Sequence, residues 1–257
     1  MKCEVKKYDP SNQKIEIIFK ETNSAFMNAL RKYILSSVPT MAIDEVTFYK
    51  NGSGMYDEMI ALRLGLLPLK TDLDSYVLPE KCECTDKTCA KCSVEVFAKK
   101  KGPGILYAKD LEFSDPGVKP VYPMMEIVKL DVNQEIEFTG YARLGTGKKH
   151  AKYSPGFCYY RNLVQIETKK LDKELSEKII SMCPGKVFDE NLNPKYKENC
   201  DICNKCVELS EDAIKVIPLE DQFVFYLESF GQLDIKRILR EGLKALIEDL
   251  KEFEEII

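Results

Sequence analysis

The sequence lacks several features that mark common classes of protein. Among its 257 residues, no apolar run approaches the ~20 residues that a membrane-spanning helix needs. The first residues, M-K-C-E-V-K-K-Y, have none of the apolar core of a secretory signal peptide. No glycine fingerprint of a flavin or nucleotide site is present. We therefore expect a cytoplasmic protein with no membrane segment, and we find no motif for a nucleotide-dependent redox enzyme.

The chain also has no excess of positive charge and little histidine. The chain has 38 Lys and Arg against 42 Asp and Glu, a net charge of −4. Because proteins bind phosphate backbones mainly through clustered Lys and Arg, this balance disfavours a dominant nucleic-acid-binding surface, and we expect contact with DNA only through partners. His150 is the only histidine, and a lone histidine without an evident nucleophile is a weak candidate for a catalytic base. We predict no catalytic residue.

Cysteine, in contrast, is abundant for a cytoplasmic protein. Eight of the ten cysteines fall into two groups of four. In a reducing compartment, spaced cysteines are more often metal ligands than disulfides. Cys3 and Cys158 stand apart, and we expect both to be plain buried or half-buried thiols, since a free cysteine behaves as a small hydrophobic residue.

The first group lies within the string K-C-E-C-T-D-K-T-C-A-K-C-S. Four thiolates this close in sequence can surround one tetrahedral ion, as in structural zinc sites. The Cys-x-Cys start is tighter than the usual Cys-x2-Cys, so a metal-free cysteine-rich loop is the alternative. We predict a zinc-type loop at residues 82–92, with one Zn²⁺ bound by Cys82, Cys84, Cys89 and Cys92.

The second group has the spacing of an iron–sulfur site. Cys200-x2-Cys203-x2-Cys206 places three thiolates at three-residue steps, which suits one face of an iron–sulfur cube, and Cys183 precedes a proline, as the fourth ferredoxin cysteine does. In two-cluster ferredoxins, the fourth cysteine of each run ligates the other cluster. Here the ligand positions of the second cluster hold other residues, namely Lys173, Ser176, Ile179 and Ser210.

We therefore predict one cluster, most simply [4Fe–4S], in a ferredoxin-like segment of residues 171–215; the sequence leaves three or four irons open. Its ligands would be Cys183, Cys200, Cys203 and Cys206. Three roles stay open for it. It pins a segment too small to fold alone, it regulates assembly through its loss under oxidants, or it transfers electrons.

Two amphipathic helices are predicted at opposite ends of the chain. The first begins after the capping residues Thr22, Asn23 and Ser24 and ends before Pro39. In the last forty residues, apolar side chains recur at alternating steps of four and three, which is typical of a helix that packs lengthwise on another helix. This second stripe comprises Leu239, Leu243, Leu246, Leu250, Phe253 and Ile257, widened by Ile235, Ile238 and Ile247. The alternative for each stripe is that it packs within its own domain.

The rest of the chain reads mainly as strands. Residues 2–20 predict two strands joined by a turn at Asp9–Asn12. From Glu45 to Leu69 we expect short strands and turns, and further strands at Glu126–Ala142, near Phe157–Lys169 and at Gln222–Glu228.

Several strings carry a family resemblance. N-A-L-R-K-Y-I-L-S-S-V-P-T-M-A-I-D-E-V and D-E-M-I-A-L-R-L-G-L-L-P-L are similar to the α-like subunits of DNA-directed RNA polymerases, above all the archaeal D and eukaryotic third-largest subunits. The stretch that ends in H-A-K-Y-S-P, the L-E-S-F-G-Q-L junction and the zinc-type loop resemble the same subunits. The resemblance implies a structural or subunit-contact role for Gly147, Lys148, His150, Lys152 and Tyr153.

The resemblance also implies a partner and a function. In that family, the matching helices pair with a smaller α-like subunit, called L in archaea, and the dimer is the platform for the large catalytic subunits, which carry the catalytic magnesium. Contacts with subunits B, N and P are expected in the same way. The residues chosen for the dimer interface are Phe26, Leu30, Tyr33, Ile34, Leu239, Leu243, Leu246 and Leu250.

The resulting prediction is a non-catalytic assembly subunit of the polymerase, a nucleotidyltransferase complex, with an α+β fold. A discontinuous dimerisation domain (residues 1–40, 152–170 and 216–257) would carry a mostly-β insertion at 41–151 and the ferredoxin-like insertion at 171–215. Two alternatives remain: an iron–sulfur electron carrier or oxidoreductase subunit, which the cluster alone would support, and a zinc-bearing nucleic-acid-binding protein, which the acidic balance disfavours.

Overall fold

A computed structural model describes residues 1–86 and 88–257. The chain divides into two compact units. The first comprises Met1–Pro10, Lys14–Arg31 and Cys158–Leu227, and the second Ser11–Gln13, Lys32–Phe157 and Glu228–Ile257. The chain contains both α-helices and β-sheets, which confirms the predicted α+β fold class. Within the described residues, no helix combines the length and apolar character that crossing a membrane requires.

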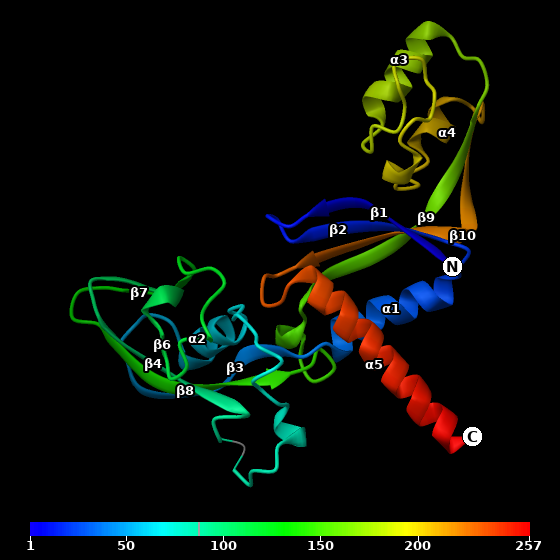
Figure 1. Ribbon diagram of the computed structural model, residues 1–257. Helices are drawn as coiled ribbons and strands as arrows, with labels where there is room; N and C mark the ends of the chain where they lie inside the picture. Colours follow the sequence, from blue (N-terminus) through cyan, green and yellow to red (C-terminus); the bar gives the residue numbers. More distant parts are fainter. Residues whose placement is uncertain (87) are drawn as a thin grey trace. The chain divides into compact units, whose positions relative to one another are not determined.

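The first unit is built on a four-stranded sheet (Figure 1). Its strands, in spatial order, are β1 (Lys2–Asp9), β2 (Lys14–Lys20), β10 (Ile214–Ser229) and β9 (Gly156–Thr168). Ile15, Ile17 and Phe19 alternate with more exposed residues along β2, as the sequence pattern predicts. The ring of Phe19 lies 5.9 Å from that of Phe225 on β10, edge to face, so the two central strands share one apolar face.

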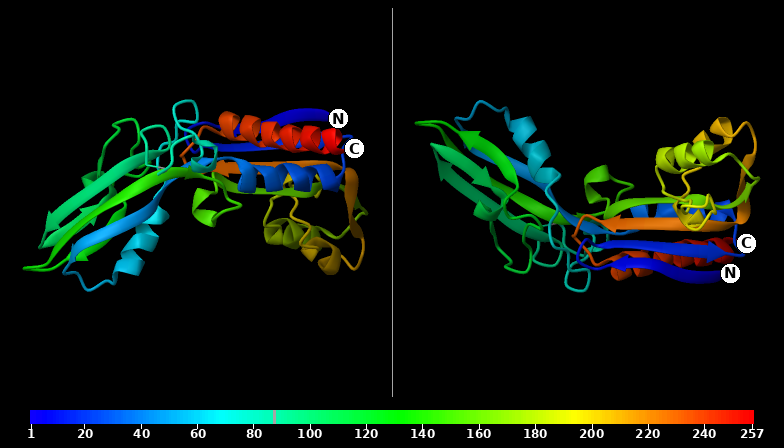
Figure 2. Two further views of the ribbon diagram at one scale, coloured as in Figure 1. Left: turned by 90° about the horizontal axis from the view of Figure 1, so that it is seen from below. Right: turned by 90° about the horizontal axis from the view of Figure 1, so that it is seen from above.

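The segment between β9 and β10 forms a small substructure at the far end of these two long strands (Figure 2). It contains α3 (Lys173–Met182), the 3-10 turn η4 (Lys197–Asn199) and α4 (Lys205–Leu209). Its own apolar core consists of Val164, Ile166, Ile179, Val187, Phe188, Leu192 and Ile214. Ile179 and Ser210, which stand where ligands of a second cluster would be, are both buried, and the Ser210 hydroxyl donates to the Val207 carbonyl.

The second unit is mainly β-structure with one central apolar core. A four-stranded sheet has the order β3 (Thr40–Asn51), β8 (Glu135–Gly145), β4 (Ser93–Lys101) and β6 (Glu112–Phe113), and β5 (Gly104–Tyr107) pairs with β7 (Glu126–Leu130). Short 3-10 turns lie at η1 (Pro79–Lys81), η2 (Ala108–Asp110) and η3 (Ala151–Tyr153). Phe138 of β8 is fully buried in the core, which also receives Ile60 and Leu64 from α2 (Asp57–Gly65).

Helix α2 corrects the sequence-based prediction of short strands and turns between Glu45 and Leu69. Asp57 and Glu58 lie in its first turn and Arg63 in its last, where each charge opposes the helix dipole. Ile60 and Leu64 are one helical turn apart and bury the same face. Exposed apolar residues between and beside them, such as Met59, Leu62 and Leu66, obscured this period in the sequence.

The two predicted amphipathic helices are α1 (Ser24–Ser37) and α5 (Ile235–Ile256). The Asn23 carboxamide oxygen accepts the Phe26 N–H at 2.9 Å, so Asn23 caps α1 as predicted. In the second unit, α5 approaches the later part of α1 closely at Gly242. A Cβ atom at Gly242 would lie 2.7 Å from Ile34 Cγ1, so only glycine permits this approach without a shift.

Candidate metal centres and subunit interface

The first cysteine group is anchored to secondary structure at both ends. Cys82 directly follows η1, and Cys92 directly precedes β4. The N–H groups of Cys92 and Ser93 both donate to the Cys89 carbonyl at 3.0 Å, so a tight turn fixes the second pair of thiols. Lys87, inside the predicted zinc-type loop, lies outside the described residues.

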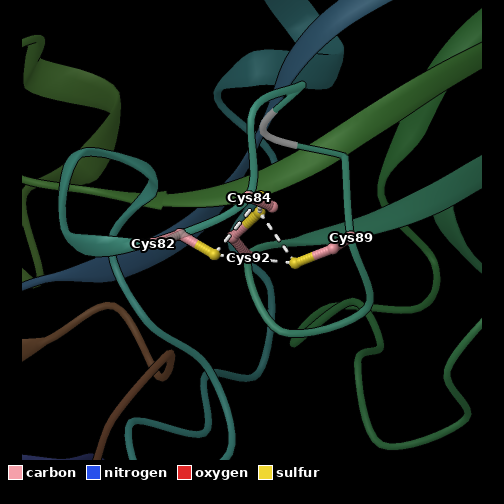
Figure 3. A group of neighbouring side chains, drawn as sticks. All are labelled: Cys82, Cys84, Cys89 and Cys92. Atoms are coloured by element: carbon pink, nitrogen blue, oxygen red, sulfur yellow. Dashed lines mark hydrogen bonds between the residues drawn. The ribbon is translucent and has the colours of Figure 1, made fainter.

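The four thiols of this group point toward one another (Figure 3). Neighbouring Sγ atoms are 3.3 to 3.6 Å apart, and all four lie within 4.8 Å of one another. A tetrahedral ion with Zn–S bonds of ~2.3 Å holds its sulfurs ~3.8 Å apart. The four sulfurs are therefore spaced for a single tetrahedral ion, with no ligand position left open.

Thiol protonation differs within this group. The pKa of Cys84 falls to about 6 because the thiols of Cys82 and Cys89 donate hydrogen bonds to its sulfur. Burial raises the pKa of Cys92 to about 12. An amide hydrogen bond from Cys84 lowers the pKa of Cys82, but hydrogen bonds with the neighbouring thiols and burial outweigh it, so the net shift is upward. Because metals bind thiolates, a metal entering this site must displace protons.

The second cysteine group lines one small pocket. Cys183 follows the last residue of α3, Cys200 follows η4, Cys203 lies in the next loop and Cys206 lies in α4. The structure thus brings the four predicted ligands together. Asp201, Asn204 and Lys205 also line the pocket, and apolar side chains supply the rest of the wall: Ile166, Ile179, Met182, Val187, Phe188, Leu209 and Val216.

Backbone N–H groups point at the sulfurs of this second group. Val187 N–H donates to Cys183 Sγ at 3.5 Å. Burial raises the pKa of Cys200 and of Cys206, and amide hydrogen bonds from Ile202 and Val207 oppose that rise. Ile202 has φ +58°, a left-handed conformation that β-branched residues rarely adopt. The loop therefore accepts backbone strain while it directs an amide at a ligand sulfur.

The two groups differ in spacing. Among the described residues, the Cys82 group is the one set whose ligand atoms all lie within 4.8 Å of one another, so the sulfurs of the second group are set more widely. Cys203 is exposed, whereas the other three thiols of its group are half-buried. The two groups therefore offer four thiols each for metal binding, at two different spacings.

The two isolated cysteines have different surroundings. Cys158 is buried, and burial raises its pKa to about 12, which confirms the prediction. Cys3 is exposed, so the prediction was wrong for this residue. It lies on β1, an edge strand whose side chains are exposed over nearly its whole length.

The structure supports a structural role for the H-A-K-Y-S-P stretch. Lys152 Nζ and Tyr153 Oη each donate to Asp44 Oδ1 at 2.8 Å, and His150 Nδ1 accepts the Lys152 N–H. Burial by itself would raise the pKa of Asp44, but the hydrogen bonds from Lys152 and Tyr153 lower it to about 2. His150 thus accepts a backbone hydrogen bond beside a half-buried ion pair.

The predicted interface residues fall into two sets. Leu30 and Ile34 are only 2% and 0% exposed within this chain, and their role at an interface stays a prediction. Phe26, Tyr33, Leu239 and Leu246 are half-buried, and Leu243 and Leu250 are exposed. Tyr33 Oη donates to the Asp249 carboxylate at 2.6 Å, a hydrogen bond that raises the Tyr33 pKa.

Helix α5 has one buried face and one exposed apolar face. Ile235, Ile238 and Gly242 form its buried face. A second apolar stripe is exposed, and we call it the α5 stripe: Leu243, Ile247, Leu250 and Phe253, with 39%, 51%, 58% and 61% of their surface exposed. Ile247 and Phe253 follow the same period as the leucines, so the signal for them was present in the sequence.

Comparison with known families matches residues 43–157 to the RNA polymerase Rpb3/RpoA insert domain. That match places the second unit's β-structure in a class of polymerase subunits. Over the whole chain, DNA-directed RNA polymerase subunit Rpo3 of Methanosphaera stadtmanae is 37% identical, covering 91% of this chain and 90% of the relative. The Rpo3 proteins of Pyrococcus horikoshii (38%; 93% and 92% covered) and Methanothermobacter thermautotrophicus (39%; 86% and 86%) are similarly close. The chain belongs to the family of archaeal RNA polymerase subunit Rpo3, the D subunit.

Proposed function

We propose that this protein is a non-catalytic assembly subunit of archaeal DNA-directed RNA polymerase. Family membership gives the complex, and the α5 stripe carries the proposal that the chain works by assembling with other subunits. The small α-like subunit L is the proposed partner at this stripe, and subunits B, N and P are proposed contacts elsewhere. Phosphodiester synthesis belongs to the large subunits, and DNA is met only through the complex, which acts in the cytoplasm. The relatives named above support an assembly subunit of the polymerase. They give no support to an iron–sulfur electron carrier.

The α5 stripe supports a helix–helix contact in particular. Its residues are separated by four, three and three positions, the spacing of one face of a helix. Contiguous exposed apolar surface of this kind marks interaction sites in soluble proteins. A partner that presents a matching apolar helix would remove the stripe from water, and each fully buried side chain contributes roughly 1.5–3 kcal/mol.

We also propose the two metal assignments. The Cys82 group fits one structural Zn²⁺, because its sulfurs have nearly the spacing of a tetrahedral ion. The second group fits one [4Fe–4S] cluster, because four widely set cysteines line one mostly apolar pocket and amides point at their sulfurs. Both metal groups would stabilise the local fold around them. The division of the chain into insertions at residues 41–151 and 171–215 stays a prediction.

Co-expression with subunit L tests the function. Leu250→Glu and Ile247→Glu should each weaken the one-to-one complex at least about 30-fold, the effect of ~2 kcal/mol at an interface hot spot. Lys251→Glu, next to Leu250 on the exposed end of α5, controls for added negative charge. Sedimentation and titration calorimetry give stoichiometry and affinity. A wild-type chain that stays monomeric with subunit L, or stripe variants that bind as tightly as wild type, would refute the proposed interface.

A further inference from the structure

Two side chains of the four-stranded sheet meet at a single residue beside the second cysteine group. Glu198 lies in η4, two positions before Cys200. Arg161 Nη2, from β9, donates to the Glu198 carbonyl at 2.7 Å, and Lys6, from β1, forms an ion pair with the Glu198 carboxylate. The side chains of Lys6 and Glu198 are 30% and 17% exposed. Glu198 is therefore held through its backbone and its side chain at once.

The two contacts come from opposite edges of the sheet. The strand order β1-β2-β10-β9 puts Lys6 on one edge strand and Arg161 on the other. With strands ~4.8 Å apart, these edges are about 14 Å from each other. Both side chains reach Glu198, so η4 must lie across one face of the sheet between them.

The sheet departs from regular pairing where it supplies the lysine. Val5 pairs with Ile17 and Lys7 with Glu16, so Lys6 is an extra residue in β1, a β-bulge. Bulges redirect a side chain and are over-represented next to functional sites. Here the bulge occurs at Lys6, the residue of β1 that forms the ion pair with Glu198.

The turn η4 also contacts the two segments that carry Cys200 and Cys183. The Cys200 N–H donates to the Lys197 carbonyl at 3.1 Å, which closes the turn onto the ligand. The turn after Cys183 packs directly on Asn199, since a Cβ atom at Gly185 would lie 2.3 Å from the Asn199 carbonyl oxygen. Fixing Glu198 thus fixes the backbone beside Cys200 and beside Cys183.

We propose that Lys6 and Arg161 clamp Glu198 and thereby position Cys200 and Cys183 for the metal cluster, which ties cluster retention to the four-stranded sheet. Lys6, Arg161 and Glu198 are positioning residues, since none touches the pocket directly. This inference rests on the proposed iron–sulfur cofactor. Partners that orient metal ligands from outside the ligand set commonly change metal affinity 10- to 100-fold when they are removed.

The rate of iron release measures how firmly the clamp retains the cluster. Anaerobically loaded full-length protein is mixed with a ferrous-iron chelator, and the rate of release is recorded with visible circular dichroism of the cluster. Glu198→Gln and Lys6→Met should each release iron on the order of tenfold faster than wild type. The double variant should be no faster than either single variant, because both remove the same contact. Glu190→Gln, an exposed glutamate of the same segment, should match wild type.

A charge exchange separates positioning from general stability. Lys6→Glu combined with Glu198→Lys restores an ion pair of reversed polarity and should return the release rate toward wild type, while either change alone speeds release. Full loading with unchanged release rates in all variants would overturn the clamp alone. A wild-type chain that takes up no iron and sulfide would overturn the cofactor proposal and the clamp with it.

Discussion

Each of the two cysteine groups contains four thiols, but the spacing between the sulfur atoms differs between the groups. In residues 82–92 the ligands are close in sequence, and local backbone hydrogen bonds bring their sulfurs to within 3.3–3.6 Å of their neighbours. In residues 183–206 they come from α3, a 3-10 turn, a loop and α4, and they line a small pocket. Local sequence spacing brings the first four thiols together, whereas the second four depend on tertiary structure around them.

The two groups also differ in what supports them. The Cys82 group is continuous with β4, which is part of a sheet with a large core. The second group sits in a segment whose core has seven buried residues, including residues of β9 and β10. A segment of that size is marginal without a metal. Loss of metal should therefore disturb the second region much more than the first.

Cys206→Ala should have the largest effect. With three ligands left and α4 no longer joined to the cluster, we expect iron to fall from about four atoms per chain to less than one. Residues 171–215 should become sensitive to proteolysis, while zinc content stays unchanged. Iron, sulfide and zinc assays with mass spectrometry of the proteolytic fragments check this. Retention of four irons, or loss of zinc as well, would break the comparison.

Cys92→Ala should have a smaller and separate effect. Zinc should fall from one atom per chain to less than about 0.1, since a structural zinc site needs all four ligands. The melting temperature should fall by roughly 4–8 °C, the effect of ~2 kcal/mol in a chain of this size. Iron content should not change. Equal loss of iron would show that the two regions are not independent.

Zinc affinity should rise with pH. In the metal-free chain, Cys82 and Cys92 have raised pKa values and keep their protons at neutral pH, whereas Cys84, with a pKa of about 6, is already mostly a thiolate. Binding displaces at least two protons, so affinity should increase on the order of a hundredfold per pH unit between pH 6.5 and 8. Competition with a chromophoric zinc chelator measures this. An affinity independent of pH would contradict the assigned protonation states.

The mildest test distinguishes thiols within the first group. In metal-free protein at pH 7, iodoacetamide should modify Cys84 at least about tenfold faster than Cys92, because the thiolate is the nucleophile and Cys92 is both buried and protonated. Peptide mass spectrometry at short reaction times gives both rates. Similar rates would mean that the loop opens when it lacks metal.

Features with a strong local signal could be predicted from the sequence. Asn23 caps α1, residues 2–20 form two strands, and the second cysteine group gathers as its spacing implies. Pro184 after Cys183 was the one clue that joined this distant residue to the other three, and the pocket shows all four together.

Features that depend on tertiary packing could not be predicted in the same way. An apolar period on α1 is the same whether a residue packs inside the chain or against a partner, so the sequence could not show that Leu30 and Ile34 are buried within this chain. Only the close approach at Gly242 shows that the chain itself covers Ile34. The Lys6 bulge and its contact with Glu198 depend on strands far apart in sequence, and no local pattern marks them.

Native mass spectrometry of the anaerobic complex with subunit L tests the central claim most directly. It records subunit stoichiometry and metal content in one spectrum. We predict a one-to-one heterodimer in which this chain carries one zinc and one cluster of four irons and four sulfides. A chain that stays monomeric beside an excess of subunit L, or one that carries a single zinc in each cysteine group, would contradict it.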